Sequence, residues 1–337
     1  MKSIVIALRW VKFFLLEVKT RMKCSLVATY LEIGDNNVLT NWTFKMYSTM
    51  QTHHASTFRH VPIVSRPVSP ERVAQVLADE WKLFTKNTKA SEAESKRAFD
   101  SLPLGVTSSF QHWDPYPISI ASAEGAWMTD VDGRKLLDLS MGFGAMLAGH
   151  LNPIVVEEIQ SSLRTGMLFV TPSPISTDAA ERICKRFGID QVRFTNSGTE
   201  STMYAVRVAR SVTGRMGLLK VEGGYHGSYD PFVVSSKPSL DVIGDPENPI
   251  PAIDSNLVPG DIYVVPFNNL IALERMFEAN SSKIACFIVE PVLENLAIIL
   301  PDAGYLEGVR ALCDKYDVIL IFDEVKTGLT AGAHGAS

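Results

Sequence analysis

The stretch Asp317-Val-Ile-Leu-Ile-Phe-Asp323-Glu324-Val325 decides the fold, because it joins an apolar run directly to an acidic pair. Residues 318–322 are apolar at every position, which is typical of a strand buried on both faces of a parallel sheet. Open α/β sheets bind ligands at the carboxyl ends of such strands. Asp323 is therefore predicted to lie at a ligand site, where a fixed carboxylate suits a protonated pyridine-type nitrogen. The alternative is that Asp323 caps a following helix or turn.

Other apolar segments repeat this pattern earlier in the chain. We predict strands at residues 191–194, 216–221, 262–265 and 284–289. Segments of helical length lie between them, and one is marked by apolar residues at helical spacing: Leu306, Val309, Leu312 and Tyr316. Strands that alternate with helices indicate βαβ units and a mainly parallel sheet. The predicted fold class is therefore α/β.

The region before this sheet has a different pattern. A helix is predicted from Ser69, with Pro70 in its first turn. A charged stretch follows at residues 86–97, which we interpret as a solvated continuation. Residues 126–134 predict a hairpin, because Asp132-Gly133 supplies a turn between two short strands.

Composition narrows the function classes. The chain has 337 residues, of which 46% are hydrophobic and 20% charged, enough for a substantial core. A net charge of −5 without a long basic run argues against a nucleic-acid surface. No Cys/His cluster has metal-ligand spacing, so no metal site is expected. The cysteines are widely spaced, which favours a reducing compartment; they are Cys24, Cys184, Cys286 and Cys313.

The N-terminus combines apolar residues with regularly spaced basic residues. Residues 4–16 are apolar but interrupted by Arg9 and Lys12, so stable insertion into a membrane is not expected. Basic residues between Lys2 and Lys23 fall on nearly one helical face, which predicts a basic amphipathic helix. An organelle presequence and an artefact or alternative start of the sequence are both compatible with this pattern.

Three polar segments follow predicted strands and would project from the same edge of the sheet as Asp323. Residues 195–200 (Thr-Asn-Ser-Gly-Thr-Glu) lead into a helix whose first N–H groups suit a dianionic phosphate. Residues 222–227 (Glu-Gly-Gly-Tyr-His-Gly) present an aromatic ring between glycines, and residues 290–295 (Glu-Pro-Val-Leu-Glu-Asn) add a carboxamide. Helix capping or half-buried loops explain each segment alone, but their joint occurrence favours one ligand site.

Taken in order, these motifs resemble those of the class III aminotransferases, which use pyridoxal phosphate. The resemblance is carried by Phe194–Glu200, Gly223–Gly227, Val289–Val292 with Asn295, Tyr305–Gly308 and Leu320–Val325. The branch with glutamate-1-semialdehyde aminomutase and the β-amino-acid aminotransferases is indicated by Gly105–Phe110, Asp132–Arg134, Met141–Gly144 and Gly149-His150. The match runs from about Lys89 to the C-terminus.

The resemblance implies fold type I, in which a large domain has a mainly parallel central sheet flanked by helices. A smaller domain comes from both chain ends, and the protein works as a homodimer. We expect residues 1–65 to be an N-terminal extension and residues 66–125 the N-terminal part of the small domain. Residues 126–337 would form the large, cofactor-binding domain, incomplete at its C-terminus.

The resemblance also implies roles for individual residues. Asp323 would bind the pyridine nitrogen, and Glu290 and His226 would be supporting residues. The other expected contacts are Ser197, Gly198 and Thr199 to the phosphate, Tyr225 and Val325 to the two ring faces, and Asn295 near the ring hydroxyl.

The family's Schiff-base lysine lies further downstream of Asp323 than this chain reaches. We therefore expect a C-terminally truncated chain that binds the cofactor weakly and without covalent attachment, and whose turnover is lower by orders of magnitude without the lysine. An open sheet edge beside residues 318–322 is also expected. Lys326 is expected to face solvent or a supporting position, because strand residues three apart point to opposite faces.

Three functions stay open at this point. The first is a transaminase that moves an amino group between an amino acid or amino-ketone and a keto acid or aldehyde. The second is an aminomutase, and the third is a non-catalytic partner that pairs with a full-length paralogue. The continuation at residues 326–329 (Lys-Thr-Gly-Leu) favours the transaminase. A cytoplasmic location is expected, or a mitochondrial one if the N-terminus is a presequence.

Overall fold

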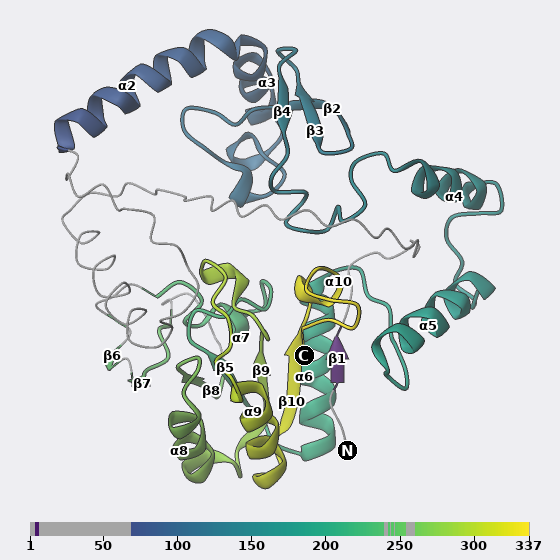
Figure 1. Ribbon diagram of the computed structural model, residues 1–337, viewed down its shortest axis with the longest axis vertical. Helices are drawn as coiled ribbons and strands as arrows, with labels where there is room; N and C mark the ends of the chain where they lie inside the picture. The colour runs from purple at the N-terminus through teal and green to yellow at the C-terminus, as the bar shows by residue number, and fades with distance from the viewer. Residues whose placement is uncertain are drawn as a thin grey trace. The chain divides into compact units, whose positions relative to one another are not determined.

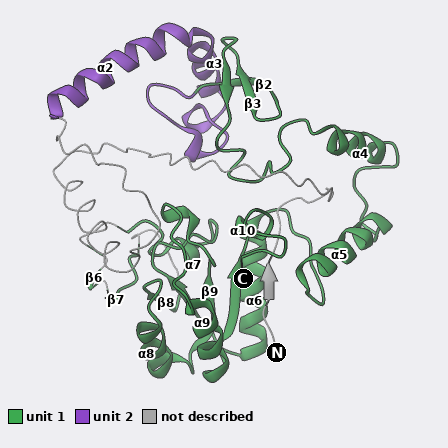
Figure 2. Ribbon diagram, in the orientation of Figure 1, with its two compact units in different colours: residues 1–14, 118–337 green, residues 15–117 purple. Residues whose placement is uncertain are grey.

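The computed structural model describes residues 69–238, 247–253 and 260–336, together with 242, 244–245 and the backbone of 4–6. Two compact units divide the chain, as Figure 2 shows. One contains residues 15–117, and the other contains residues 1–14 and 118–337.

The described part of the smaller unit is helical. It consists of α2 (Pro70–Asn87), α3 (Lys89–Phe99) and two short 3-10 turns, η1 (Pro103–Gly105) and η2 (Ser109–Gln111). The helix predicted from Ser69 is confirmed, since the side chain of Ser69 accepts a hydrogen bond from the Arg72 N–H at 3.2 Å. The buried hydroxyls of Thr88 and Tyr116 are 3.0 Å apart and hold the end of α2.

The larger unit contains the central sheet (Figure 1). Its strands are β1 (Ile4–Ile6), β5 (Gly217–Val221), β8 (Ile262–Val265), β9 (Ile284–Val289) and β10 (Ile319–Asp323). The order is β1-β10-β9-β5-β8, and every neighbouring pair is parallel. The α/β fold class and the strands expected near residues 216–221, 262–265, 284–289 and 318–322 are confirmed.

Helices cover both faces of this sheet. On one face, α6 (Gly198–Thr213) buries Ala205, Val206 and Ala209 against the strands. On the other face lie α8 (Leu270–Asn280) and α9 (Tyr305–Lys315). All six residues of β9 are buried, as its uninterrupted apolar run predicts. Short helical segments follow three strands: α7 (Asp230–Val233), η3 (Glu294–Leu296) and α10 (Thr327–Thr330).

A small antiparallel sheet precedes the parallel one in the sequence. It consists of β2 (Ile120–Glu124), β3 (Trp127–Asp130) and β4 (Lys135–Leu137), in that order. The predicted hairpin is β3–β4, and the Asp130 carboxylate closes its turn by accepting N–H bonds from Asp132 and Arg134 at 3.0 and 2.8 Å. Two helices follow, α4 (Pro153–Leu163) and α5 (Pro174–Phe187), and a separate strand pair is formed by β6 (Gly244–Asp245) and β7 (Asn248–Pro249).

Two expectations about the sheet are wrong. Residues 191–194 are not a strand, because no strand of the described sheet pairs with them. The outer edge of β10 is not open either, since β1 pairs with it in parallel and places Ile4 opposite Ile321 and Ile6 opposite Asp323. Residues 4–6 are therefore a strand rather than part of the expected amphipathic helix. The rest of that helix and Cys24 lie outside the described residues.

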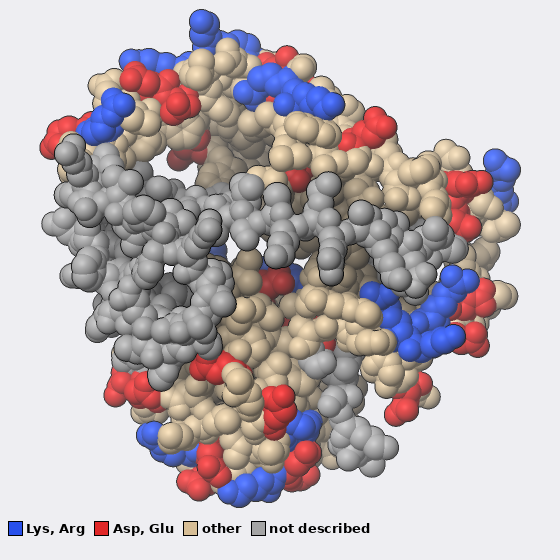
Figure 3. Space-filling view, in the orientation of Figure 1, with Lys and Arg blue, Asp and Glu red and all other residues tan. Residues whose placement is uncertain are grey.

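Surface and thiol features complete the description. Within the described residues, no helix has both the length and the apolar character needed to cross a membrane. Lysines and arginines lie among aspartates and glutamates on the face drawn in Figure 3. The described cysteines, Cys184, Cys286 and Cys313, are free thiols.

The β1–β10 pairing predicts a local effect of deleting residues 1–6. Hydrogen exchange should speed up by about tenfold or more at those amides in residues 319–323 that face β1, because their ladder partners are removed. Exchange mass spectrometry measures this, and β9 is an internal control because β10 and β5 flank it on both sides. Unchanged exchange in β10 would contradict the pairing.

Candidate active site at the carboxyl edge of the sheet

Two side-chain hydrogen bonds build the N-terminus of α6. The Ser197 hydroxyl accepts a hydrogen bond from the Glu200 N–H at 3.1 Å, and the Glu200 carboxylate accepts one from the Asn196 N–H at 2.7 Å. The Ser197 bond is an N-cap, and the Glu200 bond reaches the residue before it, so the two together fix the start of the helix at Gly198. The first N–H groups of any helix lack intrahelical acceptors and carry the positive end of its dipole. Ser197, Gly198 and Thr199 therefore surround a helix end that suits an anion.

The loop after β5 passes directly against this helix end. The Ser228 N–H donates to the Thr199 hydroxyl at 3.2 Å, and the Thr202 hydroxyl donates to the carbonyl of His226 at 2.8 Å. A Cβ added at Gly227, whose φ is +108°, would lie only 2.8 Å from the Cα of Thr199. Only glycine fits at this crossing. Thr202 was not recognised from the sequence, because a threonine inside a helix gives no signal of a contact made 24 residues away.

His226 and Asp323 form a buried pair at the strand ends. His226 Nδ1 lies 2.8 Å from Asp323 Oδ2, and the two residues are 2% and 6% exposed. The other carboxylate oxygen, Oδ1, accepts the Val325 N–H at 3.1 Å, which is the local turn contact that the capping alternative expected. His226 Nε2 is buried and has no hydrogen-bond partner among the described residues. A carboxylate oxygen carries two lone pairs, so Asp323 can accept a further donor.

Glu290 connects a third strand end to the same loop. Its carboxylate accepts the Tyr225 N–H at 3.0 Å. Burial raises the pKa of Glu290 above its usual value, while the nearby His226 and the Tyr225 N–H act in the opposite direction. Asn295, half-buried in η3, makes no hydrogen bond recorded within the described structure, but its neighbour Leu296 lies against Gly223 of the loop.

The two residues expected on the ring faces are accessible, in contrast to the buried carboxylates. Tyr225 is 43% exposed and Val325 is 37% exposed. Val325 also contacts the start of α6, because a Cβ at Gly198 would lie 3.1 Å from both of its methyl groups. Apolar surface is therefore available to a ligand close to the buried Asp323.

Lys326 is not part of strand β10, so strand alternation does not determine the direction of its side chain. Strand β10 ends at Asp323, and the chain then turns into α10 with Lys326 directly before that helix. Lys326 is half-buried, and its charge contributes to lowering the pKa of Glu290 against the larger effect of burial. The side chain therefore acts electrostatically on one of the predicted site residues.

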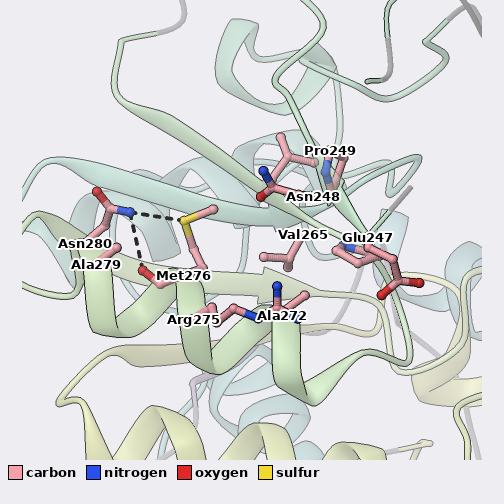
Figure 4. A pocket seen from close by; sticks show the side chains of 11 residues that line it. Glu247, Asn248, Pro249, Val265, Ala272, Arg275, Met276, Ala279 and Asn280 are labelled. Atoms are coloured by element: carbon pink, nitrogen blue, oxygen red, sulfur yellow. Dashed lines mark hydrogen bonds between the residues drawn. The ribbon is translucent and has the colours of Figure 1, made fainter. Parts of the chain in front are cut away.

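Two cavities of the larger unit lie away from these residues. Figure 4 shows a cavity of about 180 Å³ beside α8, lined by residues that include Asn248, Arg275 and Met276. A wider hollow of about 830 Å³ lies between α5, α6 and residues 190–195. Neither is lined by any of the nine predicted cofactor-binding residues.

Comparisons with known proteins identify relatives of this chain. The model of the aminotransferase class-III family matches residues 109–336. Glutamate-1-semialdehyde 2,1-aminomutase of Myxococcus xanthus (strain DK1622) is 39% identical over 255 residues, which cover 74% of this chain and 58% of the relative. The protein of the same name from Methanocella arvoryzae (strain DSM 22066 / NBRC 105507 / MRE50) is 41% identical over 248 residues, covering 72% and 56%.

Solved structures give the same relationship. An omega-transaminase from Sphaerobacter thermophilus has a TM-score of 0.70 and 32% identity, over 73% of this chain and 57% of its own. A β-phenylalanine aminotransferase from Variovorax paradoxus has a TM-score of 0.66 and 30% identity, over 76% and 56%. A transaminase with pyridoxal phosphate bound has a TM-score of 0.69 and 31% identity, over 74% and 58%. The chain spans between half and two thirds of the length of these proteins, and it belongs to the class III aminotransferase family.

Proposed function

We propose that this chain binds pyridoxal phosphate at the carboxyl edge of the sheet and that the bound cofactor serves the transfer of an amino group between an amino acid or amino-ketone and a keto acid or aldehyde. The observation that carries the proposal is the buried His226–Asp323 pair, 2.8 Å apart, beside the capped start of α6. Family membership supports the same chemistry.

The residues present fit the phosphate. The N–H groups at the start of α6 and the hydroxyls of Ser197 and Thr199 offer donors at the positive end of a helix of 16 residues. Gly227 lets the loop approach this end without a side chain in the way. A dianionic group held here would be stabilised by hydrogen bonds and by the helix dipole together.

The residues present also fit the ring. Asp323, held by His226 and by the Val325 N–H, keeps a carboxylate fixed where a protonated ring nitrogen can donate to it. Tyr225 and Val325 provide an aromatic and an aliphatic surface for the two ring faces. When bound, the cofactor supplies an electron sink for the carbon next to the substrate nitrogen. His226 restrains Asp323 in orientation, and Glu290 holds the loop that carries Tyr225.

An aminomutase is a second candidate, because both sequence relatives named above are aminomutases. The two candidates differ in their need for an acceptor. When the family's Schiff-base lysine is present, both candidates should convert bound pyridoxal phosphate to the pyridoxamine form on addition of an amino donor, and absorbance follows this change. Only the transaminase should require a separate keto acid or aldehyde to restore the first form. No spectral response to any amino donor would speak against both candidates and favour a non-catalytic partner.

A homodimer is the proposed assembly. The segment between α4 and α5 carries large apolar side chains in solvent, with Leu168 91% exposed and Met167 82% exposed. An exposed apolar cluster of this kind is typical of a protein–protein contact. The free thiols of the described part of the chain are compatible with the proposed cytoplasmic location, and a mitochondrial location remains the alternative.

Substitution Asp323→Asn should alter the electronic state of the cofactor more than its binding. The amide cannot hold the ring proton, whereas the phosphate and ring-face contacts remain. The ¹⁵N chemical shift of labelled pyridoxal phosphate should change from that of a protonated to that of an unprotonated nitrogen, with affinity reduced by about tenfold or less. Asp178→Asn, at an exposed position of α5, is the matched control. An unchanged nitrogen shift in Asp323→Asn would remove Asp323 from the site.

Substitution Gly227→Ala should abolish phosphate binding, because the new methyl group would push α6 away from the loop. Gly214→Ala is the matched control: Gly214 also has a positive φ, +69°, but no atom lies within 4 Å of a Cβ built there. Both variants should lose about 1–3 kcal/mol of unfolding free energy from backbone strain. Only Gly227→Ala should lose affinity for pyridoxal phosphate in a fluorescence titration. Equal affinities in the two variants would contradict a phosphate site between the start of α6 and the loop of Gly227.

Substitution Leu168→Asp should convert a dimer to a monomer, because it places a charge in the proposed contact. Val212→Asp is the control, since Val212 is 70% exposed at the far end of α6. Light scattering coupled to size exclusion measures both. A wild-type chain that is already monomeric, or a Leu168→Asp chain that stays dimeric, would contradict this assignment.

A further inference from the structure

A lysine is buried in the middle of the parallel sheet. Lys220 of β5 is 0% exposed, and it is the one lysine or arginine that is buried among the described residues. Its neighbours across the sheet are Val264 of β8 and Ile288 of β9, which belong to one apolar cluster. Lysine is almost never buried in this way without a specific partner.

The partner is a backbone carbonyl that follows α7. Lys220 Nζ donates to the Val234 carbonyl at 2.6 Å. The next carbonyl along the chain, that of Ser235, accepts the Gly223 N–H, also at 2.6 Å. Two consecutive carbonyls are thus bound by two groups of the β5 segment, one inside the strand and one just after it. These two hydrogen bonds hold residues 234–235 next to the end of β5, where the loop that carries Tyr225 and His226 begins.

The fastened segment is itself well defined. Ser235 is 2% exposed, its φ is +49°, and it exchanges hydrogen bonds with Ala252: its N–H donates to the Ala252 carbonyl at 3.0 Å, and its hydroxyl accepts the Ala252 N–H at 2.8 Å. A buried residue in this backbone region is retained only where its surroundings hold it. Lys220 holds the carbonyl of Val234, the residue directly before Ser235.

Charges at the sheet edge act on the same amine. Burial lowers the pKa of Lys220 to about 7, and the carboxylates of Glu290 and Glu222 act in the opposite direction. These two carboxylates follow β9 and β5, and Glu290 also holds the Tyr225 N–H. Either protonation state of the amine has an N–H to donate to Val234.

We propose that Lys220 is a positioning residue that clamps residues 234–235 to the end of β5 and thereby fixes the 223–227 loop, which presents Tyr225 and His226 to the cofactor. The part of this proposal that concerns the cofactor rests on the proposed function. The clamp itself concerns only the protein, so it can be measured without any ligand.

The test is Lys220→Met, which keeps the apolar stem and removes the donor. Amide exchange at residues 223–227 and 235 should become at least about tenfold faster, since residues 234–235 lose one of the two hydrogen bonds that fasten them to the β5 segment. The affinity for pyridoxal phosphate should fall by about tenfold, and the circular dichroism of the bound cofactor should change because Tyr225 is no longer held against it. Lys220→Gln, which has a shorter donor, should give an intermediate exchange rate and provides a second variant if Lys220→Met fails to fold.

Two controls separate the clamp from general loss of stability. Leu218→Ala opens a cavity on the same face of β5, two residues earlier, and should lower the unfolding temperature without changing exchange at 223–227 or the cofactor dichroism. Lys283→Met removes an exposed lysine just before β9 and should change neither. Unchanged loop exchange in Lys220→Met, or the same change in Leu218→Ala, would overturn the clamp. Absence of cofactor binding in the wild-type chain would overturn the proposed function alone, and loop exchange would still decide the clamp.

Discussion

The hydrogen bond between His226 Nδ1 and Asp323 Oδ2 is the contact on which the rest of the site depends, because it joins the ends of two strands that are not neighbours. His226 follows β5 and Asp323 ends β10, while β9 lies between them in the sheet. The residue after β9, Glu290, binds the N–H of Tyr225 in the same loop. Side chains thus connect three strand ends at one edge of the sheet. These ends lie at the same edge because all three strands run parallel.

This arrangement buries several charged or polar side chains in the interior, where each loses its contact with water. Asp323, Glu290, His226 and Lys220 are all buried, and a buried polar group destabilises the fold unless it has hydrogen-bond partners. Each of the four has at least one, and the partners are mostly backbone groups of loops at the sheet edge. The apolar layers under α6, α8 and α9 supply the stability that such a site requires. Core and site are therefore coupled through the same strands.

Much of the fold and of the candidate site could be predicted, since strand ends were marked by abrupt changes from apolar to polar residues. The segments around residues 217–221, 284–289 and 319–323 each show this change, and Ser197 with Glu200 forms a helix start that follows from local chemistry. The errors came from assuming that local pattern continues. Residues 191–194 (Gln-Val-Arg-Phe) have only two apolar members and no pairing partner in the described sheet. The reasoning about Lys326 used strand alternation, which no longer applies beyond Asp323, the last residue of β10.

The sequence by itself determined the α/β class, the helix starts at Ser69 and Ser197 and the residue types at each strand end, because these depend on contacts within a few residues. Tertiary structure alone decided which strand ends meet, that β1 covers β10, and that Thr202 and Lys220 bind carbonyls 24 and 14 residues away. The sequence showed a lysine in an apolar strand, but it did not show which group this lysine binds. The reason is physical: a hydrogen bond between distant residues depends on where the whole chain places two atoms, and no local spacing records that position.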